Sequence, residues 1–147
     1  MTEQRDEAPI RERPEGVDDA TVEALGKVSE ALEAIEIARG HLYTFHRLMG
    51  TADFTLGEGV DLLREAGHDD VADRLESEVV GRNVLDGRWT FQVVEEFDDG
   101  YYSAFKQAEQ DAREQLAQGV RHLHEAGLKQ QRRTTGRSGH EPRPPQR

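Results

Sequence analysis

The chain has 147 residues, which is enough for one domain of ordinary size with a buried core. Charged residues make up 33% of it and hydrophobic residues 35%, a composition typical of a globular domain with polar ends rather than of a fully disordered chain. Cysteine is absent, which excludes disulfides, zinc–thiolate sites and thiol catalysis. The sequence has neither an apolar run long enough to span a membrane nor an apolar export segment after Met1, so we expect a cytoplasmic protein.

The net charge is −11, and it is unevenly distributed. Residues 128–147 carry six Lys or Arg and one Glu, a charge of +5, which leaves −16 on the rest of the chain. Because an acidic body repels phosphate backbones, we expect the folded part to bind no nucleic acid. The basic end could contact a polyanion, although such tails are usually solvated or lie against their own acidic body. Its cations are Lys129, Arg132, Arg133, Arg137, Arg143 and Arg147.

Both ends of the chain combine proline, glycine and mixed charges without periodicity, which is typical of disorder. We therefore predict a disordered leader over 1–16, an ordered domain over 17–127 and a disordered basic tail over 128–147. Within the domain, apolar residues recur at helical spacings of three, four and seven. The predicted fold class is all-α, a bundle of four or five helices.

The first long helix is predicted to start at Asp18 or Asp19, because acidic side chains suit a helix N-terminus. Its apolar arc covers more than half of the circumference, as expected for a central helix that is contacted on two sides. The arc consists of Leu25, Val28, Leu32, Ile35, Leu42, Phe45 and Met49, flanked by Ile37 and Leu48. Gly40 lies inside this helix and predicts a bend or a close crossing with another helix.

A second helix is predicted to start at Thr55, which has capping-box spacing to Glu58, and to end at Gly67. A third helix should follow from the aspartate pair 69–70. The last long helix is predicted from apolar residues that recur at helical spacing from Phe105 to Leu123, and it should end at the Glu-Ala-Gly sequence of residues 125–127.

Residues 81–101 are ambiguous, because both strand alternation and helical spacing fit their aromatic and valine residues. A single strand would have no partner elsewhere in the chain, so we favour helix or irregular structure for this segment.

Polar side chains lie on the apolar seam of the first helix. Arg39 and His46 are seven residues apart there, and a buried Arg must be paired while an inward His needs a hydrogen-bond partner. The acids of residues 95–99 are the expected partners. Two interpretations stay open: a structural Arg–carboxylate network that fixes helix register, or a polar ligand pocket in the bundle core. The pocket would be built from Arg39, Tyr43, His46 and Glu95 or Glu96.

Six of the nine aromatic residues fall between positions 89 and 105. Clustered aromatics are typical of a partner-binding hot spot, and equally of the core of a small bundle. A symmetric dimer would be the simplest use of any that stay exposed. The partner-binding candidates are Arg88, Trp89, Phe91, Phe97, Tyr101 and Tyr102.

Neither a metal site nor a catalytic residue nor a cofactor is predicted. A di-iron bundle needs more than one Glu-x-x-His motif, and this chain has a single one, from Glu65 to His68, at a predicted helix end. The glycine-rich nucleotide-binding motifs and the GxSxG motif of hydrolases are absent. The sequence therefore favours a protein that is not an enzyme.

The chain contains the segments ARGHLYTFHRLMG at 38–50, VVGRNVLDGRWTFQVVEEFDDGYY at 79–102 and KQQRRTTGRSGHEPR at 129–143. Together they resemble a family of small hypothetical proteins from high-GC Actinobacteria. The resemblance spans most of the folded region and the basic tail. It implies a cytoplasmic setting and assigns no catalytic residue.

Two functions stay open. The first is a non-enzymatic helical protein that forms a homodimer or binds a protein partner through residues 88–105. The second is a small-molecule or metal-binding bundle with a polar core site around His46. A closed, paired network around His46 would favour the first function, and an open cavity lined by several acids would favour the second.

Overall fold

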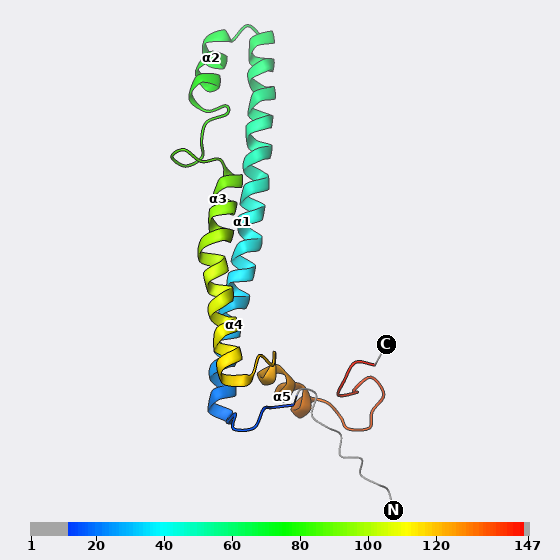
Figure 1. Ribbon diagram of the computed structural model, residues 1–147. Helices are drawn as coiled ribbons and strands as arrows, with labels where there is room; N and C mark the ends of the chain where they lie inside the picture. Colours follow the sequence, from blue (N-terminus) through cyan, green and yellow to red (C-terminus); the bar gives the residue numbers. More distant parts are fainter. Residues whose placement is uncertain (1–11, 146–147) are drawn as a thin grey trace, which may run out of the picture. The chain divides into compact units, whose positions relative to one another are not determined.

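The computed structural model describes residues 12–145, shown in Figure 1. Most of these residues are helical and none of them forms a strand, which confirms the all-α fold class. The elements are α1 (Asp19–Glu65), α2 (Asp69–Glu78), α3 (Thr90–Phe97), the π-helical segment η1 (Asp98–Tyr102), α4 (Ser103–Ala117) and α5 (Leu123–Arg132). Residues 1–11 of the predicted leader lie outside the described part of the chain. Within residues 12–145, none of the helices has both the length and the apolar character that a membrane span requires.

The chain divides into two units. The first unit combines the residues up to Glu33 with those from Phe105 onward, and the second unit runs from Ala34 to Ala104. In the first unit, α5 and the end of α4 pack against the first turns of α1 in one hydrophobic cluster. Its buried members are Val22, Ala117 and Leu123, with Val17, Leu25 and Val120 partly buried around them. The second unit buries only Val60, Ala72 and Val94 among its described hydrophobic side chains.

α1 begins at Asp19, in agreement with the sequence. The Asp18 carboxylate accepts a hydrogen bond from the backbone N–H of Thr21 at 2.8 Å. This bond satisfies a donor that the helix itself leaves unpaired, and hydrogen bonding from the side chain and then the backbone of Thr21 lowers the pKa of Asp18.

The end of α1 at Gly67 also agrees with the prediction. Gly67 has φ +85°, the left-handed conformation that favours glycine. Its N–H donates to the carbonyl of Arg64 at 3.0 Å, and the N–H of His68 donates to the carbonyl of Leu63 at 2.8 Å. These two bonds form a Schellman motif, which satisfies carbonyls at the helix end.

The predicted start of a second helix at Thr55 is wrong, because α1 continues through this position to Glu65. Threonine is a residue type that favours helix starts, but it is also accommodated inside this helix: the hydroxyl of the nearby Thr51 donates to the carbonyl of Arg47, one turn earlier, at 3.1 Å. The predicted close crossing at Gly40 is also wrong within the described chain, since a methyl group placed there would meet nothing within 4 Å.

The segment between α2 and α3 is irregular, and the chain is helical again from Thr90, so the prediction for residues 81–101 is confirmed. A tight turn closes between Leu85 and Arg88, whose backbones form an isolated bridge. From Thr90 the chain remains helical through α3, η1 and α4 as far as Ala117.

The predicted end of the last long helix at residues 125–127 is wrong. α4 ends at Ala117, where Gln118 and Gly119 adopt positive φ values of 54° and 76°. A new helix, α5, then carries the Glu-Ala-Gly sequence in its interior and continues to Arg132. Residues 128–132, predicted as disordered, are therefore helical. The cause is tertiary, because this reversal places Leu123 in the hydrophobic cluster of the first unit.

Candidate functional site

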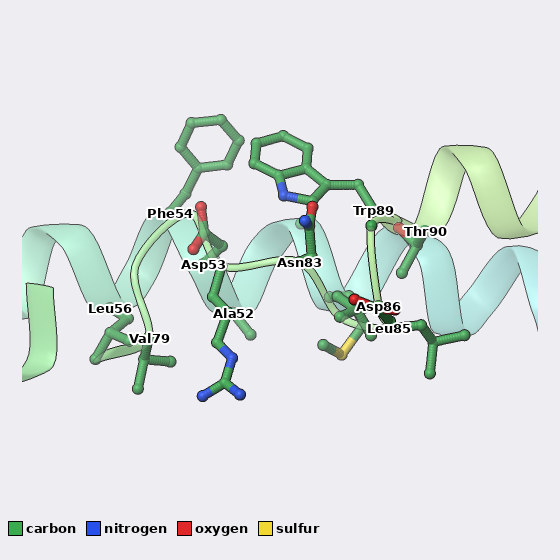
Figure 2. Close-up of a pocket in the computed structure, with 15 residues that line it drawn as sticks. Ala52, Asp53, Phe54, Leu56, Val79, Asn83, Leu85, Asp86, Trp89 and Thr90 are labelled. Carbon is green, nitrogen blue, oxygen red and sulfur yellow. The ribbon is translucent and has the colours of Figure 1, made fainter. Parts of the chain in front are cut away.

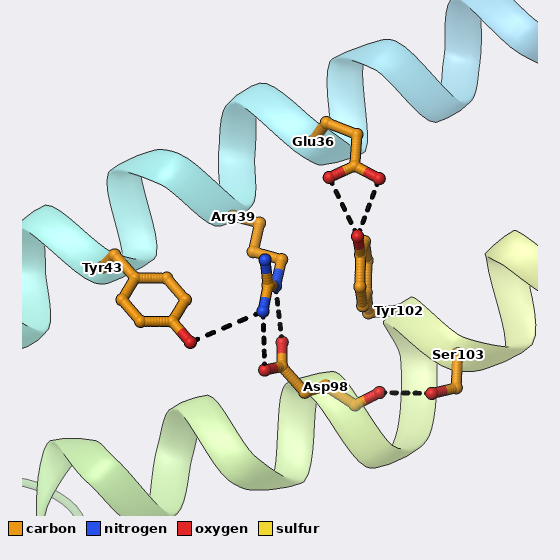
Figure 3. Close-up of polar contacts among 6 residues, drawn as sticks. All are labelled: Glu36, Arg39, Tyr43, Asp98, Tyr102 and Ser103. Carbon is orange, nitrogen blue, oxygen red and sulfur yellow. Dashed lines mark hydrogen bonds and ion pairs between the residues drawn. The ribbon is translucent and has the colours of Figure 1, made fainter.

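The π-helical segment η1 organises the polar side chains of the second unit. The backbone N–H of Ser103 donates to the carbonyl of Asp98, five residues earlier, and the Ser103 hydroxyl donates to the same carbonyl at 2.5 Å. A π-turn holds one residue more than an α-turn, so it changes which side chains share a face before and after it. Figure 3 shows the result: Asp98 and Tyr102 both point toward α1.

Arg39 of α1 is the centre of the resulting network. Its Nε donates to Asp98 Oδ1 at 2.8 Å and its Nη2 donates to Asp98 Oδ2 at 3.0 Å, a two-bond pairing. These bonds hold the pKa of Asp98 below its usual value and raise the pKa of Arg39. The guanidinium also lies over two aromatic rings, 5.0 Å from the ring centre of Tyr43 and 4.7 Å from that of Tyr102.

Tyr102 connects this pair to a further residue of α1. Its hydroxyl donates to the two carboxylate oxygens of Glu36, at 2.7 and 2.9 Å. The hydrogen bond stabilises the protonated phenol and therefore raises the pKa of Tyr102. The Phe97 ring stacks on Tyr101 and on Tyr102, with ring centres 6.2 and 6.1 Å apart. This part of the second unit is thus held by paired polar groups and stacked rings.

His46 lies two turns further along α1 and is paired as well. Its Nδ1 is 2.7 Å from the hydroxyl of Thr90, the first residue of α3, and the two share a hydrogen bond. Thr90 is buried, so the bond satisfies a hydroxyl that water does not reach freely. The ring centres of Tyr43 and His46 are 6.4 Å apart, and the two rings pack edge to face.

The structure does not bring Glu95 and Glu96 to this network. Glu96 pairs instead with Arg88, whose Nε and Nη2 donate to it at 2.5 and 3.0 Å, and the pairing lowers the pKa of Glu96. Glu95 is exposed. The acid that joins Arg39 is Asp98, a member of the acidic run in which the partner was expected. The five residues predicted as a ligand pocket are therefore not assembled into one.

An apolar cleft of about 760 Å³ lies next to His46 and Thr90, between α1 and the segment from Val79 to Thr90 (Figure 2). Phe54, Leu85 and Trp89 line it, and the exposed fractions of these residues are 78%, 55% and 46%. The remaining apolar wall comes from Met49, Ala52, Leu56, Val79 and Val84, and the polar lining from Asp53, Arg82, Asn83 and Asp86.

Three polar groups of the cleft are bound within the chain. The Asp53 carboxylate accepts the N–H of Gly81 at 2.8 Å, and the indole N–H of Trp89 donates to the Gly81 carbonyl at 3.3 Å. Arg82 donates to the carbonyl of Glu78 at 3.4 Å. These bonds fix the position of the irregular segment beside α1.

The six predicted partner-binding residues fall into four places. Trp89 lines the cleft, and Phe91, the second residue of α3, is 52% exposed. Phe97, Tyr101 and Tyr102 form the stacked group beside Arg39. Arg88 holds Glu96.

The sequence interpretation missed Phe54, the most exposed aromatic side chain among the described residues. The helical spacing gives only a weak signal, since at about 100° per residue Phe54 lies about 20° beyond Leu25, at the edge of the apolar arc. A large aromatic residue at such a position is typical of a binding surface.

Among residues 12–145, His, Asp and Glu side chains do not gather into a group of three or more that could hold a metal ion. Comparison with known proteins gives no match, whether with a family model, with a curated protein or with a solved structure. The resemblance to small actinobacterial proteins stays a prediction.

Proposed function

We propose that this is a non-enzymatic binding protein, which recognises a protein partner by taking bulky apolar side chains into the cleft beside Trp89. The observation that carries the proposal is a contrast between two neighbouring regions. The polar residues around Arg39 and His46 are closed and paired, whereas Phe54, Leu85 and Trp89 are left largely exposed at the cleft.

Exposed side chains of this size supply binding energy when a partner covers them. Burying one large apolar side chain contributes about 1.5–3 kcal/mol, and aromatic residues dominate the energetics of most protein interfaces. The indole of Trp89 is held by its hydrogen bond to Gly81, so little conformational entropy would be lost when this side chain is covered.

The polar groups of the cleft favour a polypeptide over a small polar ligand. A small-molecule site needs several polar groups that converge on the ligand. Here the carboxylate of Asp53 and the indole N–H of Trp89 are both directed to Gly81. An apolar segment of a partner protein needs fewer such groups.

The test uses random peptides displayed on phage, selected against the full chain and synthesised singly. Trp89 is the only tryptophan, so its fluorescence reports binding at the cleft directly. We expect selected peptides with bulky apolar residues that shift the Trp89 emission, and we expect Phe54→Ala to weaken their binding at least tenfold. Phe91→Ala is the matched control, since it removes an exposed aromatic side chain outside the cleft and should leave the affinity unchanged.

Peptides that bind equally well to Phe54→Ala and leave the Trp89 emission unchanged would overturn the proposal. A stoichiometric non-protein mass or metal on protein purified from its own host, seen by native mass spectrometry with metal analysis, would also overturn it, in favour of the ligand-binding alternative. We further propose a cytoplasmic location, as the resemblance implies, which cell fractionation would check.

A further inference from the structure

The linker between α4 and α5 has strained backbone. Residues 118–122, which we term the hinge, include Gln118 with φ +54° and His122 with φ +63°. These are the two non-glycine residues with positive φ among residues 12–145, and both lie in this short linker. At such φ values the Cβ atom of an L-residue comes too close to the following carbonyl oxygen, so both conformations are unfavourable. Strain of this kind persists only where surrounding contacts enforce it.

The local sequence favours a continuous helix through the hinge. Leu116, Val120 and Leu123 are spaced by four and three residues, so on one helix they would lie within about 60° of one another. Proline is absent from residues 103–132, and Gly119 is the one glycine of the hinge. The side chain of His122 makes no capping bond at the start of α5, whereas a continuous helix would provide carbonyls for the first N–H groups of α5. The local sequence and the observed backbone therefore disagree in the hinge.

Contacts with the start of α1 hold the hinge in this bent form. Leu123 is 8% exposed and lies with Val22 in the hydrophobic cluster of the first unit. His124 covers Gly26 so closely that a methyl group added to this glycine would come within 3.1 Å of the His124 side chain. Glycine inside a helix is unfavourable, and here it allows α5 to approach α1 closely. The start of α1 is therefore shaped to receive α5.

The two segments that meet at this contact also carry opposite charges. Residues 17–33, which include the first turns of α1, contain five Asp or Glu and one Lys, a charge of −4. Residues 123–147 contain six Lys or Arg and two Glu, a charge of +4. A chain of net charge −11 repels its own copy as a whole. The basic end of one copy and the start of α1 in another nevertheless attract each other.

We infer that two copies of this chain exchange α5 by domain swapping. The hinge straightens, α4 and α5 become one helix, and Leu123 and His124 of each copy dock on Val22 and Gly26 of the other. A second copy is the occupant because it presents the same side chains that α5 already contacts within its own chain. The exchange keeps these contacts and releases the strain of both hinges, which offsets the entropy lost on association.

The hinge sets the balance between the monomer and the exchanged dimer. The docking contacts of α5 are the same in both arrangements, so the backbone conformation of residues 118–122 is what distinguishes them. Each dimer contains two hinges, and a substitution there therefore acts twice on the dissociation constant. A change that adds left-handed strain or raises helix propensity should tighten the dimer, and a change that removes strain should weaken it.

Disulfide trapping tests the exchange directly, and the chain suits it because it contains no cysteine. A Cβ atom added at position 26 would lie 3.1 Å from the Cβ atom of His124, so cysteines at these two positions can be bridged after a small shift. We expect the Gly26→Cys and His124→Cys variants, incubated together at about 0.5 mM and then oxidised, to form a mixed disulfide. Gly26→Cys mixed with Leu128→Cys is the matched control, since Leu128 is 46% exposed on α5 and should cross-link only by collision. Equal cross-linking in the two mixtures would overturn the inference.

Sedimentation equilibrium of the full chain, from about 1 to 500 µM after long incubation, tests the role of the hinge. We expect Gly119→Ala to tighten the dimer about 30-fold or more, since alanine is strained at φ +76° and favours a helix. Gln118→Gly should weaken the dimer by a similar factor, because glycine adopts φ +54° freely and disfavours a helix. Gly127→Ala is the matched control: this residue is inside α5 in both arrangements, and a methyl group there would meet nothing within 4 Å.

A Gly119→Ala variant that stays monomeric over this concentration range, or that loses its helical circular dichroism, would overturn the inference, because the exchanged dimer accommodates alanine in the hinge. Equal effects of Gly119→Ala and Gly127→Ala on the dissociation constant would overturn it too. Peptide binding at the cleft involves residues of the second unit, so Gly119→Ala should leave it intact, and Phe54→Ala should leave the exchange intact. The failure of one proposal is therefore distinguishable from the failure of the other.

Discussion

Arg39 of α1 and Asp98 of η1 lie 59 residues apart in the sequence and form a pair joined by two hydrogen bonds, 2.8 and 3.0 Å long. The geometry requires both a planar guanidinium and an aspartate at one position of a π-turn. A shift of either helix by one residue would break both bonds. The pair therefore fixes the register between α1 and the α3–η1 segment.

Replacement of Arg39 should lower the thermal stability of the protein. Arg39→Ala removes both bonds to Asp98 and the contacts with two aromatic rings, and we expect a melting temperature lower by a few degrees. Arg39→Lys keeps the charge but loses the planar fork, so it should restore only part of the loss. Circular dichroism melts measure both, with the exposed Arg47→Ala as control. Equal melting temperatures for Arg39→Lys and the wild type would show that the two-bond geometry contributes nothing.

The same pair should make stability depend on pH in the acid range. Hydrogen bonds from Arg39 outweigh burial and hold the pKa of Asp98 below its ordinary value of 3.8. A depressed folded pKa adds stability that is present above the unfolded pKa and is lost as the pH falls through the folded one. The stability difference between wild type and Asp98→Asn, from urea unfolding, should be constant between pH 7 and 5 and shrink below about pH 4. A difference that stays constant to pH 3 would contradict this assignment.

Tyr102 should show the opposite dependence in the alkaline range. Its hydrogen bond to Glu36 raises the folded pKa above the ordinary value of 10.0. A raised folded pKa adds stability that is present below the unfolded pKa and is lost as the pH rises through the folded one. Tyr102→Phe should therefore be less stable than wild type at pH 7, and the two should converge above pH 10. Absorbance titration at alkaline pH should lose a phenol that titrates above the ordinary value in Tyr102→Phe. Retention of that phenol would refute the prediction.

Two glycine substitutions in the second unit should change stability in opposite directions. Gly67 has φ +85° at the end of α1, so Gly67→Ala should destabilise the protein by about 1 kcal/mol. Gly57 lies inside α1 with open space where a methyl group would be added, so Gly57→Ala should stabilise the protein by up to about 1 kcal/mol. Urea denaturation of both variants measures the two signs, and a destabilised Gly57→Ala would be inconsistent with the continuous helix.

The first unit depends on Leu123, which is 8% exposed in the cluster with Val22 and Ala117. Leu123→Ala should lower the free energy of unfolding by about 2–3 kcal/mol, because it removes buried methyl groups and leaves a cavity. Leu128→Ala is the control on the same helix, since Leu128 is 46% exposed and should change stability little. Equal effects of the two substitutions in urea denaturation would mean that α5 does not dock through Leu123.

The sequence predicted the features that depend on neighbouring residues. Asp18 and Asp19 indicated the start of α1 and Gly67 its end, because helix termini are satisfied by groups only a few residues away. The predicted start at Thr55 shows the limit of such signals. A capping pattern inside a long helix does not interrupt it when the surrounding turns remain paired.

The candidate site could be predicted in part. Arg39 and His46 were placed correctly on the inner seam of α1, since helical periodicity depends on sequence alone. Their partners could not be assigned, because the π-turn at Asp98 changes which acid faces α1.

By itself, the sequence determined the all-α class, the caps of α1 and the polar seam, all of which depend on periodicity and on contacts within a few residues. Only the tertiary structure decided that Arg39 pairs with Asp98 rather than with Glu95 or Glu96, and that the chain reverses after Ala117 to bury Leu123. It also decided which large apolar side chains stay exposed, among them Phe54 and Leu48. Burial depends on which segments meet in space, and contacts between distant residues have no signature in local sequence.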